Sequence, residues 1–355
     1  MLQGRVDAAR VFLDKFDADH LLFLNLANIR YLCGFSGSDG ALVIGREKNF
    51  FLTDSRYTTQ AGLEVWGCEI IEYRGKLDGL KSLLKDRCAR KVGFESEFVT
   101  VATRNGIAEG LADVELVAIG EELSTLRLVK DAGEIDMLER AATIASTALQ
   151  SVLGELRPGM VEREIALELE FAMRRAGADD KSFDFIVASG ERGALPHGRA
   201  SEKQIAAGEL ITFDFGALYQ GYHSDETVTV MLGQPDQKQR EIYGIVREAQ
   251  SRAIAAVKPG VALRELDAIA RGFIEEKGYG SFFGHGLGHG VGLDVHEKPV
   301  VSFRGEGVVA EGMVFTIEPG IYLPGWGGVR IEDTLVATED GCRLLTKVPK
   351  ELIVV

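Results

Sequence analysis

Long apolar runs and basic residues are both scarce in this chain, and the two shortages exclude several classes of protein. No run approaches the ~18 apolar residues that a membrane-spanning helix needs. The chain has 40 lysines and arginines against 54 acidic residues, giving a net charge of −14. Because a nucleic-acid surface must be basic to neutralise phosphates, we expect no nucleic-acid partner and no membrane association.

Cysteine is also scarce, and the four cysteines show no CxxC spacing: Cys33, Cys68, Cys88 and Cys342. This pattern predicts free, mostly buried thiols in a reducing compartment, and it argues against a disulfide framework or a zinc knuckle. Residues 1–20 mix charged and apolar side chains and lack the apolar core of a secretion signal. We therefore expect a cytoplasmic protein.

The sequence changes character near residue 123. Buried strands are predicted at three short apolar runs, residues 20–25, 40–45 and 49–54. Residues 79–91 predict a helix between strands, an alternation that is typical of an α/β domain. Residues 131–153 then have helical periodicity, and Ser124 is a candidate cap for a first turn. We expect one domain over residues 1–123 and a second over 124–355.

The second domain contains an internal repeat. Residues 156–178 and 257–279, about 101 positions apart, each contain Pro-Gly followed by an amphipathic helical pattern. Two further pairs of segments follow in the same order, 206–216 with 309–320 and 223–230 with 329–336. One such pair carries little weight, but three in order indicate a duplication, each half being a helix followed by a β-hairpin.

Each predicted hairpin carries two carboxylates. Asp214 and Asp225 are symmetric about Tyr219–Gln220, and Glu318 and Glu332 are symmetric about Gly325. A tight antiparallel hairpin with these centres places the members of each pair opposite one another. Four such carboxylates among apolar neighbours need a cation, and hard oxygen ligands in this number favour divalent metal.

Between the hairpins lies "GHGLGHGVGLDVHE", residues 284–297, with His285, His289 and His296. The stretch alone is compatible with a three-histidine zinc site or with a glycine-rich structural loop. Beside the carboxylates, one imidazole is enough for the metal, and the other two can bind a reacting carbonyl. The glycines allow close approach of neighbouring backbone.

The motifs "FDFG", "SDETVTV", "GHGLGHGVGLDVHE", "FTIEPG" and "RIEDT", in this order, strongly resemble the pita-bread-fold metallopeptidases: methionine aminopeptidase, aminopeptidase P and prolidase. "NIRYLCGFSGSDGALVIG" and "FLTDSRYTTQA" resemble the creatinase/prolidase N-terminal domain, which methionine aminopeptidases lack. The resemblance implies an α+β protein, with an α/β N-terminal domain and a pita-bread domain of two pseudo-symmetric halves.

The resemblance also implies roles for individual residues. Two divalent metal ions per chain are expected, Mn²⁺ first and Co²⁺ or Zn²⁺ as alternatives, with five ligands: Asp214, Asp225, His289, Glu318 and Glu332. A hydroxide between the ions attacks the scissile carbonyl, and Glu318 is also the general base. Other matching positions are His197 on the leaving-group side, His296 at the oxyanion, His285 at the substrate's proline, and Tyr322 and Arg330 as supporting groups.

The resemblance implies a homodimeric enzyme that cleaves short proline-containing peptides, and we favour an Xaa-Pro dipeptidase. The alternatives are aminopeptidase P, which acts on longer peptides, and a broader methionyl-type aminopeptidase. A strict dipeptidase needs a cation for the proline carboxylate; the candidates are Arg192, Arg199 and Arg304. Creatinase and the non-enzymatic relatives lack the ligand set, so its presence argues against both.

Overall fold

The computed structural model describes residues 2–355, which form two compact units divided between Arg127 and Leu128. The boundary expected after residue 123 falls inside helix α6 (Glu121–Ser124). A 3-10 helix, Thr125–Arg127, continues directly from α6, and its Arg127 is buried. These residues group with the N-terminal unit, so the division lies later than the sequence pattern indicated.

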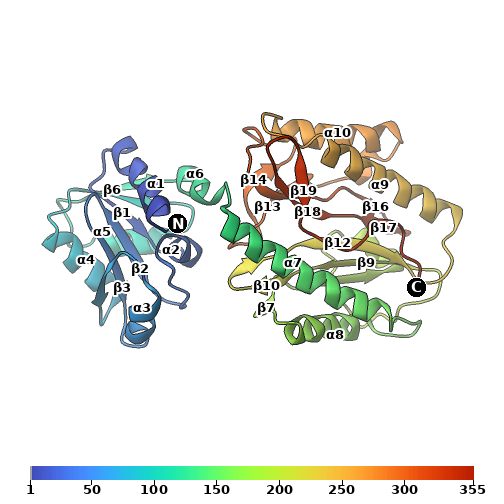
Figure 1. The fold of residues 1–355 in the computed structure, drawn as a ribbon, viewed down its shortest axis with the longest axis horizontal. Coiled ribbons are helices and arrows are strands. Elements are labelled where there is room, and N and C mark those ends of the chain that lie inside the picture. The colour runs from blue at the N-terminus through green and yellow to red at the C-terminus, as the bar shows by residue number, and fades with distance from the viewer. Residues whose placement is uncertain (1) are drawn as a thin grey trace. The chain divides into compact units, whose positions relative to one another are not determined.

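The N-terminal unit is built on a mixed sheet in the order β4-β3-β2-β1-β5-β6 (Figure 1). Its strands are β1 (His20–Phe23), β2 (Ala41–Gly45), β3 (Asn49–Thr53), β4 (Glu69–Glu72), β5 (Lys91–Glu95) and β6 (Glu115–Ile119). β2 and β3 are buried along their whole length, because the sheet is covered on both faces. The three strands expected from the apolar runs are thus confirmed.

The helices that accompany this sheet are α1 (Leu2–Lys15), α2 (Leu26–Cys33), α3 (Thr58–Glu64), α4 (Lys76–Asp86), α5 (Val101–Ala108) and α6. The helix predicted at 79–91 is α4, which starts and ends earlier. Leu80, Leu83 and Leu84 supply its buried face. Shortly after the helix ends, Cys88 has a left-handed φ of 51°, and Lys91 already belongs to β5.

The C-terminal unit contains the two expected halves. The first has α7 (Ala132–Leu153), α8 (Glu162–Arg175) and a sheet of β8 (Ile186–Ser189), β9 (Leu210–Phe215) and β12 (Glu226–Met231), with a small sheet of β7 (Asp180–Lys181), β10 (Ala217–Tyr219) and β11 (Tyr222–His223). The second has α9 (Gln237–Ala255), α10 (Leu263–Glu276), β13 (Gly288–Gly290), β14 (Glu297–Val301), β15 (Val314–Ile317), β18 (Asp333–Ala337), β19 (Cys342–Leu344) and the ribbon β16 (Gly320–Leu323)–β17 (Gly327–Arg330). In Figure 1 the helices α7, α8, α9 and α10 flank the strands of this unit.

The helix ends follow local signals. Asp131 caps α7 in a capping box with Glu134, whereas Ser124 is the last residue of α6 and caps nothing, so that prediction was wrong. The amphipathic repeats are α8 and α10, which bury Ile165, Leu169 and Met173 in the first half. Both helices end in a turn with glycine at positive φ, Gly177 and Gly278.

The two halves meet through the strands that carry the carboxylates. The backbone N–H of Glu332 donates to the carbonyl of Thr227 at 3.0 Å, and the hydroxyl of Thr334 donates to the carbonyl of Asp225 at 2.7 Å. The Arg330 N–H donates to the Thr229 hydroxyl at 3.2 Å. These bonds bring the two hairpins side by side.

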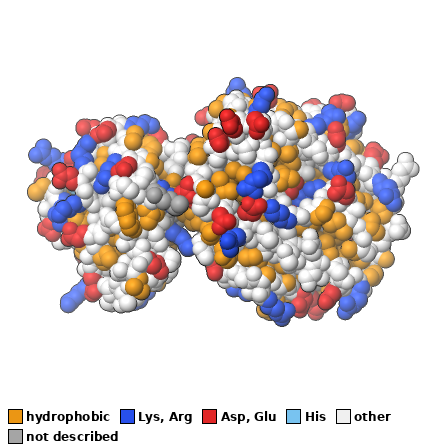
Figure 2. Space-filling model, in the orientation of Figure 1, with side chains coloured by type: hydrophobic (Ala, Val, Ile, Leu, Met, Phe, Trp, Pro, Cys, Tyr) orange, Lys and Arg blue, Asp and Glu red, His pale blue; other side chains and the backbone are white. Residues whose placement is uncertain are grey.

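Three further observations concern features other than the sheets and helices themselves. Among residues 2–355, every helix is too short or too polar to cross a membrane. The cysteines are free thiols as expected, but only Cys33 is buried and Cys88 is exposed, so the expectation of mostly buried thiols was wrong. Acidic and basic side chains are interspersed on the face drawn in Figure 2.

Candidate metal centre and substrate cleft

The first hairpin has a different register from the one predicted. Its turn is Gln220-Gly221, with φ of 47° and 81° at the two central residues, which is the two-residue turn that suits the twist of β-strands. Tyr219 pairs with Tyr222, and further along Asp214 pairs with Thr227. Asp214 therefore does not lie opposite Asp225, although the shift by two residues keeps both on the same face.

The second hairpin has the predicted register. Ile317 pairs with Asp333 and Gly320 pairs with Arg330, so Glu318 lies opposite Glu332 and the hairpin is centred on Gly325. The conformation of Gly325, with φ of 73°, is one that favours glycine. Opposed side chains in such a pair have Cβ atoms about 4.5–5.5 Å apart.

His289 reaches these carboxylates from β13, a short strand between β14 and β15. Glycine is required on either side of it: a Cβ at Gly288 would lie 2.0 Å from the carbonyl oxygen of Thr316, and one at Gly290 would lie 2.1 Å from that of Lys298. The His289 Nδ1–H donates to the carbonyl of Gly290 at 3.1 Å. Its Nε2 therefore carries the free lone pair that a metal ligand needs.

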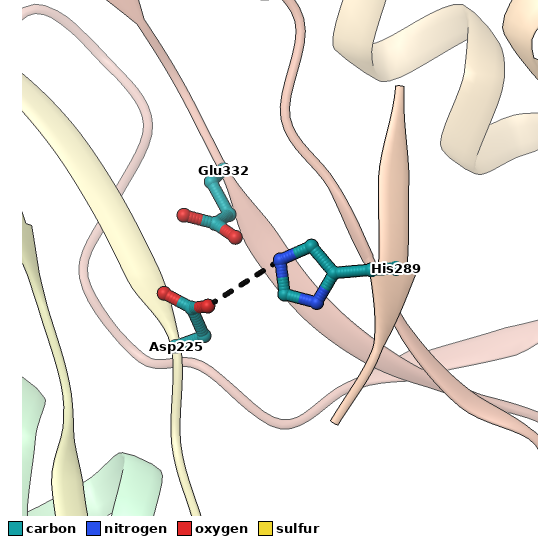
Figure 3. Close-up of side chains that lie close together, drawn as sticks. All are labelled: Asp225, His289 and Glu332. Atoms are coloured by element: carbon teal, nitrogen blue, oxygen red, sulfur yellow. Dashed lines mark ion pairs between the residues drawn. The ribbon is translucent and has the colours of Figure 1, made fainter. Parts of the chain in front are cut away.

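Three side chains converge in Figure 3: Asp225 directly before β12, Glu332 directly before β18, and His289 in β13. One potential ligand atom from each lies within 4.8 Å of the other two. His289 Nε2 is 3.6 Å from Asp225 Oδ2 and 3.3 Å from Glu318 Oε1, so Glu318 belongs to the same cluster. Four of the five predicted ligands are thus brought together, and Asp214 lines the same cleft.

The electrostatics of this cluster fit a bound cation. Burial raises the pKa of Asp225 and of Glu332 well above the usual range, and the neighbouring carboxylates raise them further. Burial raises the pKa of Glu318 to about 8. Burial also lowers the pKa of His289, which favours the neutral imidazole that metals bind. Carboxylate and imidazole donors in this number suit a divalent transition metal.

Arg330 is the cation nearest to these acids. Its Nη2 lies 2.6 Å from Asp214 Oδ2, its Nε donates to the Thr227 hydroxyl at 3.1 Å, and its Nη1 donates to the Tyr322 hydroxyl at 2.9 Å. The Tyr322 hydroxyl in turn donates to His285 Nε2 at 2.8 Å. Tyr322 and Arg330 therefore connect Asp214 to His285.

His285, His197 and His296 line the same cleft, which has a volume of about 810 Å³. His285 Nδ1–H donates to the carbonyl of Gly286 at 2.8 Å, and burial lowers the pKa of His285 to about 4. His197 and His296 are more exposed, and the His296 ring centroid lies 4.3 Å from that of His289. All three histidines are thus within one cleft with the acidic cluster.

Two hydroxyl groups beside the cluster were missed by the sequence reasoning. The Thr227 hydroxyl donates to Glu332 Oε2 at 2.7 Å, and the Thr316 hydroxyl donates to Glu318 Oε1 at 3.2 Å. Thr227 follows Asp225 by two residues, and Thr316 precedes Glu318 by two. The alternation of side chains along a strand was therefore a usable signal for both.

The candidate arginines differ in position. Arg192 donates to Glu162 Oε2 at 2.9 Å and does not line the cleft, whereas Arg199 and Arg304 do. Arg199 lies 3.5 Å from Asp184 Oδ2. Arg304 is exposed beside the ring of Phe303, and no carboxylate of the described chain lies within ion-pair distance of it.

Comparison with known proteins agrees with these features. Residues 136–339 match metallopeptidase family M24, and residues 5–129 match the creatinase/prolidase N-terminal domain.

An Xaa-Pro dipeptidase from Pyrococcus furiosus is 41% identical over 99% of this chain and 100% of its own. The structure of an Xaa-Pro dipeptidase from Bacillus anthracis, 44% identical, covers 100% of both chains with a TM-score of 0.97. That of an X-Pro aminopeptidase from Thermotoga maritima, 42% identical, covers 96% of this chain and 99% of its own with a TM-score of 0.89. The chain belongs to metallopeptidase family M24 and carries a creatinase/prolidase N-terminal domain.

Proposed function

We propose that this metallopeptidase is a dinuclear enzyme that hydrolyses Xaa-Pro dipeptides. The proposal rests on one observation above all: carboxylates of both hairpins and His289 converge in a cleft that is also lined by arginine. The similarity to proteins named Xaa-Pro dipeptidase, over essentially the whole of both chains, supports this substrate class.

In this proposal Asp214, Asp225, His289, Glu318 and Glu332 would together hold two divalent metal ions. The bound ions would supply positive charge that polarises the scissile carbonyl and lowers the pKa of water. We propose Mn²⁺, with Co²⁺ and Zn²⁺ as alternatives, because carboxylate-rich sites accept several divalent ions. Arg330 occupies one oxygen of Asp214, so the other oxygen is the one proposed as the metal ligand.

Glu318 is proposed as the general base. The Thr316 hydroxyl holds its Oε1, which lies beside His289 Nε2. The carboxylate is thereby fixed next to the cluster, where it can take a proton from the attacking water and pass it to the leaving amine. Orientation of this kind is a large part of catalytic power.

The histidines of the cleft complete the proposed chemistry. We assign to His296 a hydrogen bond to the carbonyl oxygen as it becomes negative, and to His197 a position on the leaving-group side. Burial lowers the pKa of His296, so its neutral ring keeps one N–H to donate at pH 7. His285, whose ring stacks edge-on at 5.0 Å from Phe283, is proposed to contact the proline ring.

Arg304 is proposed to bind the carboxylate of a dipeptide. It lines the cleft and is free of an acidic partner within the described residues, whereas Arg199 already has Asp184 nearby. An X-Pro aminopeptidase acting on longer peptides is the second candidate. The cleft volume of about 810 Å³ and the similarity to the Thermotoga maritima protein favour it.

Hydrolysis of three peptides by the purified protein separates these candidates from a broader methionyl-type aminopeptidase. We expect an Xaa-Pro dipeptide to be cleaved faster than an Xaa-Pro-Yaa tripeptide, and Met-Ala-Ser to be a poor substrate. Faster cleavage of the tripeptide would favour the aminopeptidase. A metal-free protein that stays inert on all three peptides after addition of Mn²⁺ or Co²⁺ would contradict the proposal.

We also propose that the enzyme acts as a homodimer in the cytoplasm, as the family resemblance implies. Light scattering after size-exclusion chromatography tests the first point, because a mass near twice 38.6 kDa is expected. Cell fractionation tests the second.

A further inference from the structure

Two histidine-bearing segments of the cleft are each fixed by a helix of the C-terminal unit. Residues 189–201, here the His197 loop, contribute Pro196, His197 and Arg199 to the cleft. Residues 283–287, here the His285 segment, contribute His285 and Gly286. Each segment is held by a buried carboxylate on the amphipathic helix of its own half, α8 or α10.

Glu162, the first residue of α8, closes the His197 loop at its neck. Its side chain is completely buried. Oε1 accepts from the backbone N–H and hydroxyl of Ser189, both at 2.8 Å. Oε2 accepts from Arg192 Nε at 2.9 Å and from the N–H and hydroxyl of Ser201 at 3.2 and 2.7 Å. One carboxylate thus joins the first and last residues of the loop.

The inner part of the His197 loop has a second fixed point. Arg330 Nη1 donates to the carbonyl of Pro196 at 3.1 Å, directly before His197. The loop is therefore fixed at its neck by Glu162 and near its tip by the arginine that also contacts Asp214. Between these two points, residues 190–194 form a 3-10 helix that packs against β17, the strand that carries Arg330. The neck, this helix and the Pro196 contact together set the position of His197.

Asp267 and Arg271 of α10 fix the backbone of the His285 segment. Asp267 is completely buried and accepts from Arg271 Nε and Nη2, both at 2.8 Å, and from the N–H of Leu287 at 3.2 Å. The paired Arg271 donates to the carbonyls of Phe283 at 2.9 Å and His285 at 2.7 Å. The backbone of His285 is thus fixed through a charged pair.

We propose that Glu162 and the Asp267–Arg271 pair are positioning residues for substrate recognition, setting His197 and His285 in the cleft. The inference rests on the proposed function. A buried carboxylate is costly unless its acceptor sites are used, and here the partners are backbone groups of the histidine-bearing segments. An apolar replacement could pack in the same space, but it would leave those N–H groups and Arg192 Nε without an acceptor.

The first test is Glu162→Gln. This substitution keeps the shape of the side chain but replaces one accepting oxygen by an NH2 group, which cannot accept a hydrogen bond. We expect kcat/KM on an Xaa-Pro dipeptide to fall about ten- to a hundredfold, with metal content unchanged. Backbone amides of residues 189–201 should exchange hydrogen faster. The matched control is Glu95→Gln, a buried carboxylate of the N-terminal unit that accepts from the N–H groups of Leu24 and Asn25. Its rates should stay within about twofold of the wild type.

The second test is Arg271→Met, with Arg271→Lys as the conservative variant. In the methionine variant we expect the ratio of kcat/KM for an Xaa-Pro dipeptide to kcat/KM for an Xaa-Ala dipeptide to fall about tenfold. The change should be larger in KM than in kcat. Lysine, with one donor group, should restore part of it. Arg252→Met is the control, since Arg252 also pairs four residues away, with Glu248, and stacks on Phe273.

The outcomes separate this inference from the proposed function. Wild-type protein inactive on every Xaa-Pro peptide would refute the function alone, and hydrogen exchange would still test the positioning. With an active wild type, unchanged rates and exchange in Glu162→Gln would overturn the inference. Loss of metal or a far larger loss of thermal stability than in Glu95→Gln would also overturn it, because the role would then be structural. If Glu162→Gln does not fold, the double variant Ser189→Ala/Ser201→Ala, which removes only two donors, replaces it with the same expectations.

Discussion

The guanidinium of Arg330 lies 2.6 Å from a carboxylate oxygen of Asp214, and its side chain is only 4% exposed. The pair joins one strand of each half of the C-terminal unit, β17 and β9. A buried arginine among acids is stabilised by its charged partners. Asp214 therefore has two cationic neighbours in the proposed enzyme, Arg330 and metal.

Replacing Arg330 by Met should destabilise the metal-free protein more than the metal-bound one. Removing one partner of a buried ion pair lowers the free energy of unfolding by about 3–5 kcal/mol, because the charge that stays buried then has no partner. Urea unfolding in EDTA and in excess Mn²⁺ measures both values. Arg343→Met serves as the control, since its ion pair with Glu139 is partly exposed and should contribute below about 1 kcal/mol. Equal effects of the two substitutions would contradict a special role of Arg330.

Glu318→Gln should abolish most turnover while the protein remains folded. Loss of a positioned general base typically reduces kcat by a factor on the order of 10²–10⁴. Steady-state kinetics and circular dichroism measure the two properties. The control is Glu311→Gln, because Glu311 is exposed and lies shortly before β15, the strand that leads to Glu318. This variant should behave as the wild type. A rate near that of the wild type in Glu318→Gln would remove this residue from the base role.

The stability of the metal-free protein should fall as pH rises from about 6.5 to about 8. Burial raises the pKa of Glu318 from 4.5 to about 8, so within this window the folded state holds a proton that the unfolded state has lost. Buried histidines work in the opposite direction, since the lowered pKa of His285 makes the protein more stable as pH rises from about 4 to 6.5. Above 6.5 they are neutral in both states and the carboxyl groups dominate.

Melting curves at several pH values, with EDTA and with Mn²⁺, measure this dependence. Metal competes with protons for the same oxygens, so stabilisation by Mn²⁺ should be larger at pH 8 than at pH 6.5. Glu318→Gln should flatten the metal-free curve, because an amide does not titrate. Metal-free protein that gains stability between pH 6.5 and 8 would show that the carboxyl groups are not held protonated.

Arg304→Met should raise KM for an Xaa-Pro dipeptide about tenfold and change KM for an Xaa-Pro-Yaa tripeptide little. A charged hydrogen bond to a carboxylate is worth about 1.5–3 kcal/mol, and a tripeptide presents its carboxylate elsewhere. Arg199→Met, in the same cleft but beside Asp184, is the matched control. If Arg199→Met and not Arg304→Met impairs the dipeptide, the carboxylate site lies at the His197 loop.

Much of the fold was readable from local patterns. The buried strands β2 and β3 are short runs rich in apolar residues, and α7 begins directly after Asp131 because Asp131 and Glu134 form a capping box. The repeat was visible because α8 and α10 keep the same length and the same helical pattern. These features depend on residues that are close in sequence.

The metal centre could be predicted only in part, because many of its contacts join residues that are far apart in sequence. The register of the second hairpin follows from Gly325, whereas the first was misjudged because its two-residue turn is Gln220-Gly221. Glu162 and Asp267 were not predicted, because an acid on a charged helix looks exposed until distant partners are known: Ser189 lies 27 residues after Glu162, and Leu287 lies 20 residues after Asp267. Thr227 and Thr316 could have been found from strand alternation.

The unequal turns of the two hairpins give the two halves unequal parts of the centre. Gln220-Gly221 separates the strands of the first hairpin by two residues, whereas residues 324–326 separate those of the second by three. Asp214 consequently faces Thr227, while Glu318 faces Glu332. The duplicated halves have diverged into complementary parts of a single centre, and His289 belongs only to the later one. The first half supplies Asp214 and Asp225, and the second supplies His289, Glu318 and Glu332, so neither half alone holds the complete set of candidate ligands.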